Sequence, residues 1–480
     1  MIAGVRAAMR RLASVTEPAD PEVLAALRRR WRELPEHVRH DAQMLGRRSV
    51  GCEGTHGVFP RCNLACAPCY HSGDANRVRV DGRHTVAEVD RQMAYLRASR
   101  GPRAFAQLIG GEVTLLDPDD HAAALQVMRR HGREPMSMSH GDFDYDYLER
   151  LAVGPDGRRR FDHLSFAGHF DTTMFGRRGA ERVGRERDLN RFRRRFCELF
   201  QRLEREHGVG HYLAHSMTVT PGNVGQIAEV VGDCRQMGFR MFSFQPAAFL
   251  GDDRRWKADY RELTAEAVWA EVERGAGARL PWGALQMGDA RCNRTAWGLQ
   301  VGDRWVAVLD DRDPADLRAR DAFLACFAGV NFGAPRPLLA ARLLRVAARH
   351  PRVVPLALRW AGRLVRRAGV LALARHGARP LTFVMHSFMD AADVRPAWEL
   401  TCRGETSDDP RVRATQERLA ACAYTMAHPE TGALVPACVQ HAVLDPQENA
   451  VLRGLLPLTP VSGRAAGGPP AAPPPPPTSR

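Results

Sequence analysis

A repeated alternation of strand-like and helix-like segments between residues 51 and 250 limits the fold of this chain most strongly. Short apolar runs suited to strands are separated by amphipathic segments suited to helices. Strands and helices that alternate in this way form a parallel sheet with right-handed crossovers. Six such units are too few for a closed barrel of eight. We therefore predict an α/β fold built on six strands, at residues 55–59, 104–109, 135–139, 163–167, 212–220 and 239–244.

Three cysteines follow the first predicted strand in a Cys-x3-Cys-x2-Cys array, at Cys62, Cys66 and Cys69. Three thiolates are too few to close a tetrahedral zinc site. They suit a [4Fe-4S] cluster that keeps one iron open, because cluster irons are held by cysteine thiolates. The alternatives are three buried structural cysteines or half of a zinc site. The array lies where barrel enzymes carry their chemistry, at the C-terminal end of a strand.

The array, with Tyr70 directly after it and Gly-Gly-Glu at 110–112 after the second strand, resembles the radical S-adenosylmethionine (SAM) superfamily over about residues 55–250. The resemblance implies a partial (β/α)6 TIM barrel and a [4Fe-4S] cluster that splits SAM reductively, so that hydrogen is taken from an unactivated C–H bond. It also implies that Gly110, Gly111 and Glu112 receive the amino group of SAM and that Tyr70 packs near its adenine. Glycines allow close approach, and a carboxylate partners an ammonium, although a plain turn also explains Gly-Gly-Glu.

Polar residues near the ends of later strands are further candidates for SAM binding. Ser165 and His169 lie at the end of the fourth predicted strand, Asn223 follows the fifth, and Gln245 follows the sixth. Each has a structural alternative: His169 as a satisfied core histidine, Asn223 as a helix cap and Gln245 as a strand-end residue.

Residues 276–460 have a different pattern, which predicts a mixed α/β extension with two hairpins, at 297–309 and 423–437. Cys422 and Cys438 flank the second hairpin, and Cys292 and Cys402 complete a set of four. Many radical SAM enzymes carry a second cluster in such an extension, and this set is predicted to hold one. Zinc or buried thiols remain alternatives, because spacing alone does not identify the metal.

The net charge of the 480-residue chain is +14, and the segment 322–389 contains eleven arginines and no acidic residue. Leucine and valine alternate with arginine over 336–380, a pattern typical of surfaces that attract anionic lipids. A solvated basic face over an apolar core is the alternative, and sparse aromatic residues argue against nucleic acid. With the 385–390 run and the paired late cysteines, this surface resembles the lipid-modifying, tetraether lipid synthase-like branch of the superfamily.

Four regions follow from these patterns: a basic helical leader (1–50), the core (51–275), the extension (276–460) and a disordered Pro-rich tail (461–480). We expect a cytoplasmic enzyme, with peripheral membrane contact, because no signal peptide or spanning segment is evident. Its substrate is a lipid, an isoprenoid or another small molecule, and flavodoxin or ferredoxin supplies electrons. The alternatives are a peptide-modifying radical SAM maturase and a non-catalytic iron–sulfur or zinc redox sensor.

Overall fold

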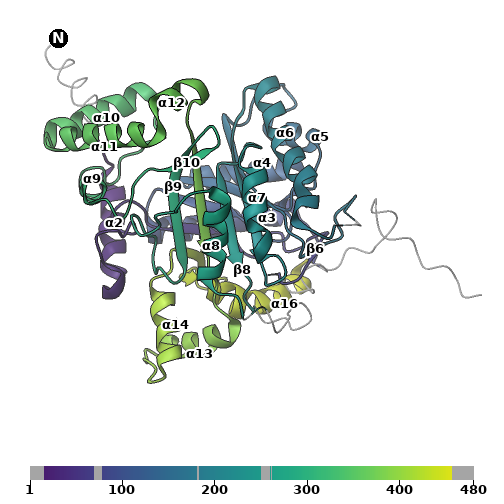
Figure 1. The fold of residues 1–480 in the computed structure, drawn as a ribbon. Helices are drawn as coiled ribbons and strands as arrows, with labels where there is room; N and C mark the ends of the chain where they lie inside the picture. The colour runs from purple at the N-terminus through teal and green to yellow at the C-terminus, as the bar shows by residue number, and fades with distance from the viewer. Residues whose placement is uncertain (1–15, 70–77, 181–182, 250–259, 261, 457–480) are drawn as a thin grey trace, which may run out of the picture.

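The structure, a computed structural model, describes residues 16–69, 78–180, 183–249, 260 and 262–456. Its described part is built around a single eleven-stranded sheet (Figure 1). Six neighbouring strands are parallel and follow one another across the sheet in chain order, which confirms the predicted α/β class. They are β1 (Cys52–Gly54), β3 (Ala104–Leu108), β4 (Arg133–Ser139), β5 (His163–His169), β7 (Gly210–Val219) and β8 (Met241–Pro246).

The first strand lies three residues earlier than predicted, at 52–54 instead of 55–59. A side chain ends it: the hydroxyl of Thr55 donates to the carbonyl of Ile109 at 2.7 Å and accepts from its N–H at 2.9 Å. These bonds take the place of the next backbone pair between β1 and β3. Residues 55–59 therefore form the approach to the cysteine loop.

The sheet continues beyond the six core strands on both sides. The hairpin β12 (Tyr424–Ala427) and β13 (Leu434–Pro436) adds to β1, and β12 is parallel to it. On the other side, β11 (Arg379–His386), an unpredicted strand, is inserted between β8 and the hairpin β9 (Asn293–Val301) and β10 (Arg304–Ala307). Both predicted hairpins are confirmed. Among the described residues the outer strands β10 and β13 do not pair with each other, so the sheet is open.

Helices cover one face of the core strands (Figure 1). Their buried apolar side chains pack against every second residue of the strands. For example, the ring centroid of Phe200 on α6 (Asn190–His207) lies 5.0 Å from that of Phe166 on β5 and 5.2 Å from that of Phe196. Burial of such faces is the main stabilising contribution. These helices are α3 (Gly82–Arg100), α4 (Pro118–Arg130), α5 (Tyr145–Ala152), α6 (Asn190–His207), α7 (Ile227–Cys234) and α8 (Ala265–Ala276).

The remaining helices lie around the ends of the sheet. The described part of the predicted leader contains α2, whose Val23, Ala26 and Leu27 are buried. The predicted tail lies outside the described residues, and the boundary at 275 stays a prediction, because the strands of the extension belong to the same sheet. No described helix is long and apolar enough to cross a membrane. The helices are α2 (Pro21–Glu33), α9 (Pro314–Cys326), α10 (Arg336–Arg349), α11 (Val353–Ala368), α12 (Val370–His376), α13 (Ala391–Cys402), α14 (Pro410–Ala420), α15 (Ala437–Val439) and α16 (Asp445–Leu455).

Candidate functional site

The loop that carries the three cysteines is tied across the carboxyl ends of the neighbouring strands. Its middle forms β2 (Ala65–Cys66), which pairs antiparallel with β6 (Met174–Phe175) beyond the end of β5. The side chain of Asn63 lies 2.7 Å from Nε2 of His140, the residue directly after β4. The loop is thus held at the edge of the sheet where parallel α/β proteins bind ligands.

The three thiols of this loop lie close enough to influence one another. Cys66 shares a hydrogen bond with Cys69, and this bond and burial raise the pKa of Cys66 well above its ordinary value. Burial, followed by the charge of Glu112, raises the pKa of Cys62 to about 12. A bound cation reverses this preference, because it favours the thiolate. The loop therefore brings together three sulfur donors, a set suited to binding a cation.

The Gly-Gly-Glu segment fastens the cysteine loop to β3. The N–H of Gly111 donates to the carbonyl of Phe59 at 2.8 Å, and that of Glu112 donates to the carbonyl of Arg61 at 2.9 Å. A Cβ added to Gly110 would lie 2.7 Å from the ring of Phe59, and one added to Gly111 would lie 2.1 Å from the Arg61 carbonyl oxygen. Both positions therefore require glycine, because residues 59–61, which lead into the cysteine loop, pack directly against them.

The carboxylate of Glu112 is buried and takes four hydrogen bonds from the protein. Oε1 accepts from the N–H and hydroxyl of Thr114 and from the hydroxyl of Ser139, and Oε2 accepts from the N–H of His140. Its exposed fraction is 1%. This arrangement makes Glu112 a brace between the ends of β3 and β4, and its contact with the amino group of SAM stays a prediction.

His169, the last residue of β5, forms an ion pair with the buried Asp171. Nε2 of His169 lies 2.6 Å from Oδ2 of Asp171. Burial alone would lower the pKa of His169, but the charge and hydrogen bond of Asp171 outweigh it and hold this pKa above its usual value. Asp171 is itself fixed by the N–H groups of Thr173 and Thr218. Both members of the pair interact with the thiols: His169 interacts with Cys69, and the charge of Asp171 helps to raise the pKa of Cys66.

Arg177, which sequence reasoning missed, lies against the ends of β4 and β5. Its Nη2 donates to the carbonyls of His140 at 2.7 Å and His169 at 3.2 Å, and its guanidinium lies over the ring of Phe170 at 5.0 Å. Its Nη1 is buried and has no hydrogen-bond partner among the described residues. The side chain is 4% exposed, and its charge interacts with Cys66. A buried donor of this kind is an uncommon feature that points to a missing acceptor.

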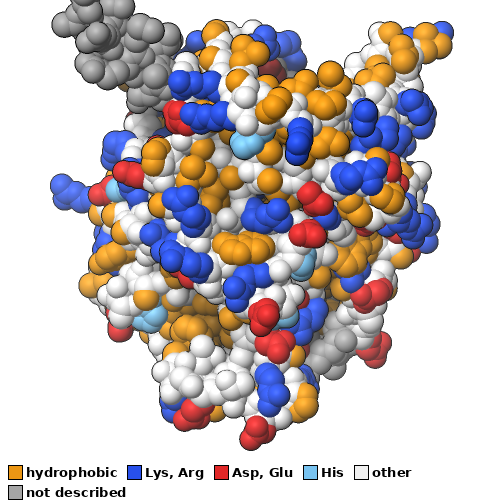
Figure 2. All heavy atoms as spheres, turned by 90° about the vertical axis from the view of Figure 1, so that its left-hand side faces the viewer, with side chains coloured by type: hydrophobic (Ala, Val, Ile, Leu, Met, Phe, Trp, Pro, Cys, Tyr) orange, Lys and Arg blue, Asp and Glu red, His pale blue; other side chains and the backbone are white. Residues whose placement is uncertain are grey.

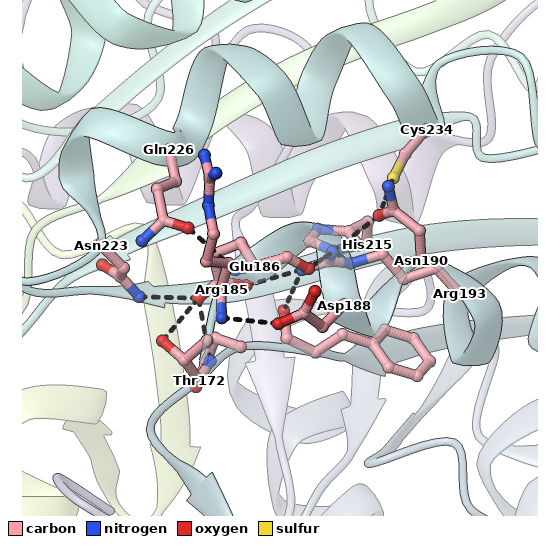
Figure 3. Close-up of polar contacts among 12 residues, drawn as sticks. Thr172, Arg185, Glu186, Asp188, Asn190, Arg193, His215, Asn223, Gln226 and Cys234 are labelled. Atoms are coloured by element: carbon pink, nitrogen blue, oxygen red, sulfur yellow. Dashed lines mark hydrogen bonds and ion pairs between the residues drawn. The ribbon is translucent and has the colours of Figure 1, made fainter. Parts of the chain in front are cut away.

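A second buried ion pair joins Glu186 to Arg193 (Figure 3). Oε2 of Glu186 lies 2.8 Å from Nη2 of Arg193, and both side chains are fully buried. Oε1 of Glu186 accepts from Thr172 and from the side chain of Asn223. Asn223 also bonds to both Thr218 and Thr220, so it links the loops after β5 and β7, and its contact with SAM stays a prediction.

The two other candidates on the strands differ in position. Gln245 lies at the carboxyl end of β8, where its Nε2 donates to Ser243 at 2.6 Å and its Oε1 is buried without a partner among the described residues. Ser165 lies in the middle of β5, because that strand continues to His169. Four residues of strand place Ser165 about 13 Å from the edge. Tyr70 lies outside the described residues.

Three of the four late cysteines influence one another: Cys438 is buried, and Cys292 and Cys422 are half-buried. The charges of Cys422 and Cys292 help burial to raise the pKa of Cys438, and burial raises the pKa of Cys292 to about 11. Nε of Arg418 donates to Sγ of Cys292 at 3.2 Å. Cys402 is exposed at the end of α13, unlike the other three, because that helix turns this position to solvent. The second cluster at Cys292, Cys402, Cys422 and Cys438 stays a prediction, and the exposed position of Cys402 sets it apart from the other three.

No family model and no curated protein match this chain. Among solved structures, native anSMEcpe with bound AdoMet and Cp18Cys peptide matches at 13% identity over 46% of this chain and 57% of that chain, with a TM-score of 0.29. Native anSMEcpe with bound AdoMet matches at 14% identity over 42% and 55%, with a TM-score of 0.27. The chain spans just over half the length of these proteins. TM-scores this low do not establish a shared fold, so the function proposed below rests on the site residues.

Proposed function

We propose that this chain is a radical SAM enzyme in which Cys62, Cys66 and Cys69 hold a [4Fe-4S] cluster and SAM binds beside it. One observation carries the proposal: the Gly110–Glu112 backbone is fastened to a loop of three interacting thiols at the carboxyl edge of the parallel strands. The order β1-β3-β4-β5-β7-β8 also agrees with a partial (β/α)6 barrel, which we propose as the architecture of residues 51–275.

The surroundings of the thiols fit a negatively charged cluster. Three thiolates bring negative charge into a half-buried loop, and the positive group of Arg177 lies near enough to offset part of it. When it is bound with SAM, such a cluster supplies the electron that breaks the sulfonium carbon–sulfur bond and leads to removal of hydrogen from an unactivated C–H bond. The protein contributes position, charge and exclusion of water.

Two orphaned polar atoms are suited to SAM. Nη1 of Arg177 is a buried donor without a partner among the described residues, and a carboxylate such as that of SAM satisfies a guanidinium well. Oε1 of Gln245 is a buried acceptor that also has no partner among the described residues, and a hydroxyl or an amino group would satisfy it. In this proposal Glu112, Asn223, Glu186 and the other braced side chains position the strand ends.

We propose a lipid or isoprenoid substrate and a second cluster held by Cys292, Cys422 and Cys438. The three thiols, which influence one another, support the second cluster. Oxygen-sensitive chemistry of this kind needs a small electron-transfer partner such as flavodoxin or ferredoxin. The alternative enzymatic function is that of a peptide-modifying radical SAM maturase. The alternative without catalysis is an iron–sulfur or zinc redox sensor.

Iron and sulfide analysis of anaerobically reconstituted protein tests the proposal. Wild type should hold about eight irons per chain, or about four if the late cysteines carry none. Replacing Cys62, Cys66 and Cys69 with Ala should remove about four and abolish formation of 5'-deoxyadenosine from SAM and dithionite. A Cys326→Ala/Cys402→Ala control should change neither quantity.

The other outcomes are distinct. Zinc without iron, or a triple variant that holds as much iron as wild type, would refute the enzyme. Iron without SAM cleavage under any reductant would favour the sensor. S-adenosylhomocysteine in place of 5'-deoxyadenosine would show that SAM is used as a methyl donor. A separate triple variant of Cys292, Cys422 and Cys438 should lose about four irons, and an unchanged count would reject the second cluster.

A further inference from the structure

Three consecutive helices, α10, α11 and α12, form a surface on which apolar and basic side chains are exposed together. We call it the α10–α12 surface. Figure 2 shows orange and blue side chains gathered in its upper part, where these helices lie, with most of the red side chains lower down. The exposed fractions are high for aliphatic residues: Leu344 71%, Val354 39%, Leu358 69%, Val365 41%, Val370 70% and Leu371 62%.

The side chains of α11 are ordered in stripes. Val354, Leu358 and Val365 are four and seven residues apart, so they lie on one line along the outside of the helix. Arg352, Arg359 and Arg366 are spaced by seven residues and form a second exposed line beside the first. A helix with an apolar strip flanked by arginine is suited to lie in a membrane interface.

The arginines of α11 are of two kinds. Arg363 and Arg367 point inward and bind the buried carboxylate of Asp316 on α9, which anchors the helix to the body of the protein. Arg352, Arg359 and Arg366 make no hydrogen bond or ion pair within the described residues. The anchoring of the helix is therefore complete without them, and their charges face outward.

We propose that the α10–α12 surface docks on an anionic lipid bilayer, with α11 in the plane of the interface. The charges are complementary, since residues 322–389 contain eleven arginines and no acidic residue. The outward leucines and valines select a bilayer over nucleic acid, because phosphate contacts use the arginines alone and base stacking uses aromatic rings. The inference concerns a surface, and it does not depend on the chemistry proposed above.

Co-sedimentation of the full chain with vesicles tests the docking without any assay of activity. Binding to vesicles of phosphatidylglycerol and phosphatidylcholine should be strong at low salt, weaker at high salt and weakest with phosphatidylcholine alone. Each arginine near an anionic surface contributes about fivefold, so Arg352→Gln/Arg359→Gln/Arg366→Gln should weaken binding about a hundredfold. Val354→Ser/Leu358→Ser/Val365→Ser should weaken it at least about tenfold while the net charge is unchanged.

A matched control separates a specific surface from net charge. Arg158→Gln/Arg403→Gln/Arg413→Gln removes the same charge from exposed positions in other elements and should change binding less than about threefold. Equal losses in the control and in the α11 arginine variant would overturn the proposal. So would binding to duplex DNA without binding to vesicles, or a dimer by light scattering that Leu358→Ser dissociates. If the wild-type protein binds vesicles but does not cleave SAM, the proposed function is rejected and the proposed docking surface is retained.

Discussion

Replacing Gly111 with Ala should disturb the cysteine loop more than any other single methyl group added to this site. The new Cβ would lie 2.1 Å from the carbonyl oxygen of Arg61 and 2.6 Å from that of Pro60. Both contacts are with backbone, so no side chain can rotate away. Because Cβ atoms in proteins essentially never approach within 3.0 Å, the loop must move by about 0.9 Å.

The free-energy cost follows from the contacts that this movement breaks. Overpacking of a tight site costs about 1–3 kcal/mol. The hydrogen bonds from Gly111 N–H to Phe59 and from Glu112 N–H to Arg61 contribute about 0.5–1.5 kcal/mol each. The expected loss is therefore about 2–6 kcal/mol of the free energy of unfolding, or an equivalent strain if the loop shifts and the body of the protein stays folded.

Two measurements on the same samples check this prediction. Urea unfolding gives the stability of the apo protein, and iron analysis after anaerobic reconstitution gives the state of the loop. Gly111→Ala should lose either the predicted stability or at least about half of the iron that Cys62, Cys66 and Cys69 hold. Gly232→Ala is the matched control, because its Cβ meets nothing within 4 Å inside α7, and it should stabilise by about 0.5–1 kcal/mol.

The reasoning fails if Gly111→Ala is as stable as wild type and takes up the same iron. That result would mean that residues 59–61 tolerate movement of about 0.9 Å, and that the glycine is not needed for contact with the loop. Loss of stability with full iron would place the strain in the fold and leave the loop geometry intact.

Two further predictions concern buried charges. Glu186→Gln leaves the guanidinium of Arg193 buried without a counter-charge and should cost about 3–5 kcal/mol in urea unfolding, whereas Glu204→Gln, half exposed, should cost less than about 1 kcal/mol. Burial alone would lower the pKa of His56, but the hydrogen bond and charge of Glu448 outweigh burial and raise it. The His56–Glu448 pair therefore stabilises the fold fully below about pH 6.5. This stabilisation is lost as the pH rises through the raised pKa of His56. Wild type should lose stability relative to His56→Gln as the pH increases above about 6.5, and parallel pH profiles would contradict the assignment.

The core strands could be predicted because their signal is local. Each has an apolar run, followed by an amphipathic helix, and their order across the sheet follows from right-handed crossovers. The strand β11 was missed because residues 379–386 end the arginine-rich segment, whose composition suggested a surface. Its Leu381, Phe383 and Met385 are buried against the helices, so pairing with β8 and β9 decides its conformation.

The site could be predicted only where its residues are neighbours in sequence. The cysteine array and Gly110–Glu112 are recognisable from spacing, but the contacts of Glu112 with Ser139 and His140 depend on how two strands end together. Arg177 and Asp171 were missed, because single charged residues in a loop carry no local signal of burial. A positive charge with several carbonyl partners is visible only once β4 and β5 are side by side.

The pairing of β1 with β12 sets the order in which this protein can be completed. One edge of β1 is covered by β3, which is synthesised soon after it, and the other edge waits for residues 424–427. At about 5–20 residues per second, the ribosome needs tens of seconds to reach them. Throughout that time the strand that leads into the cysteine loop has an unpaired edge, the kind of edge at which chains aggregate. The cysteine loop is therefore synthesised well before the sheet that supports it is complete.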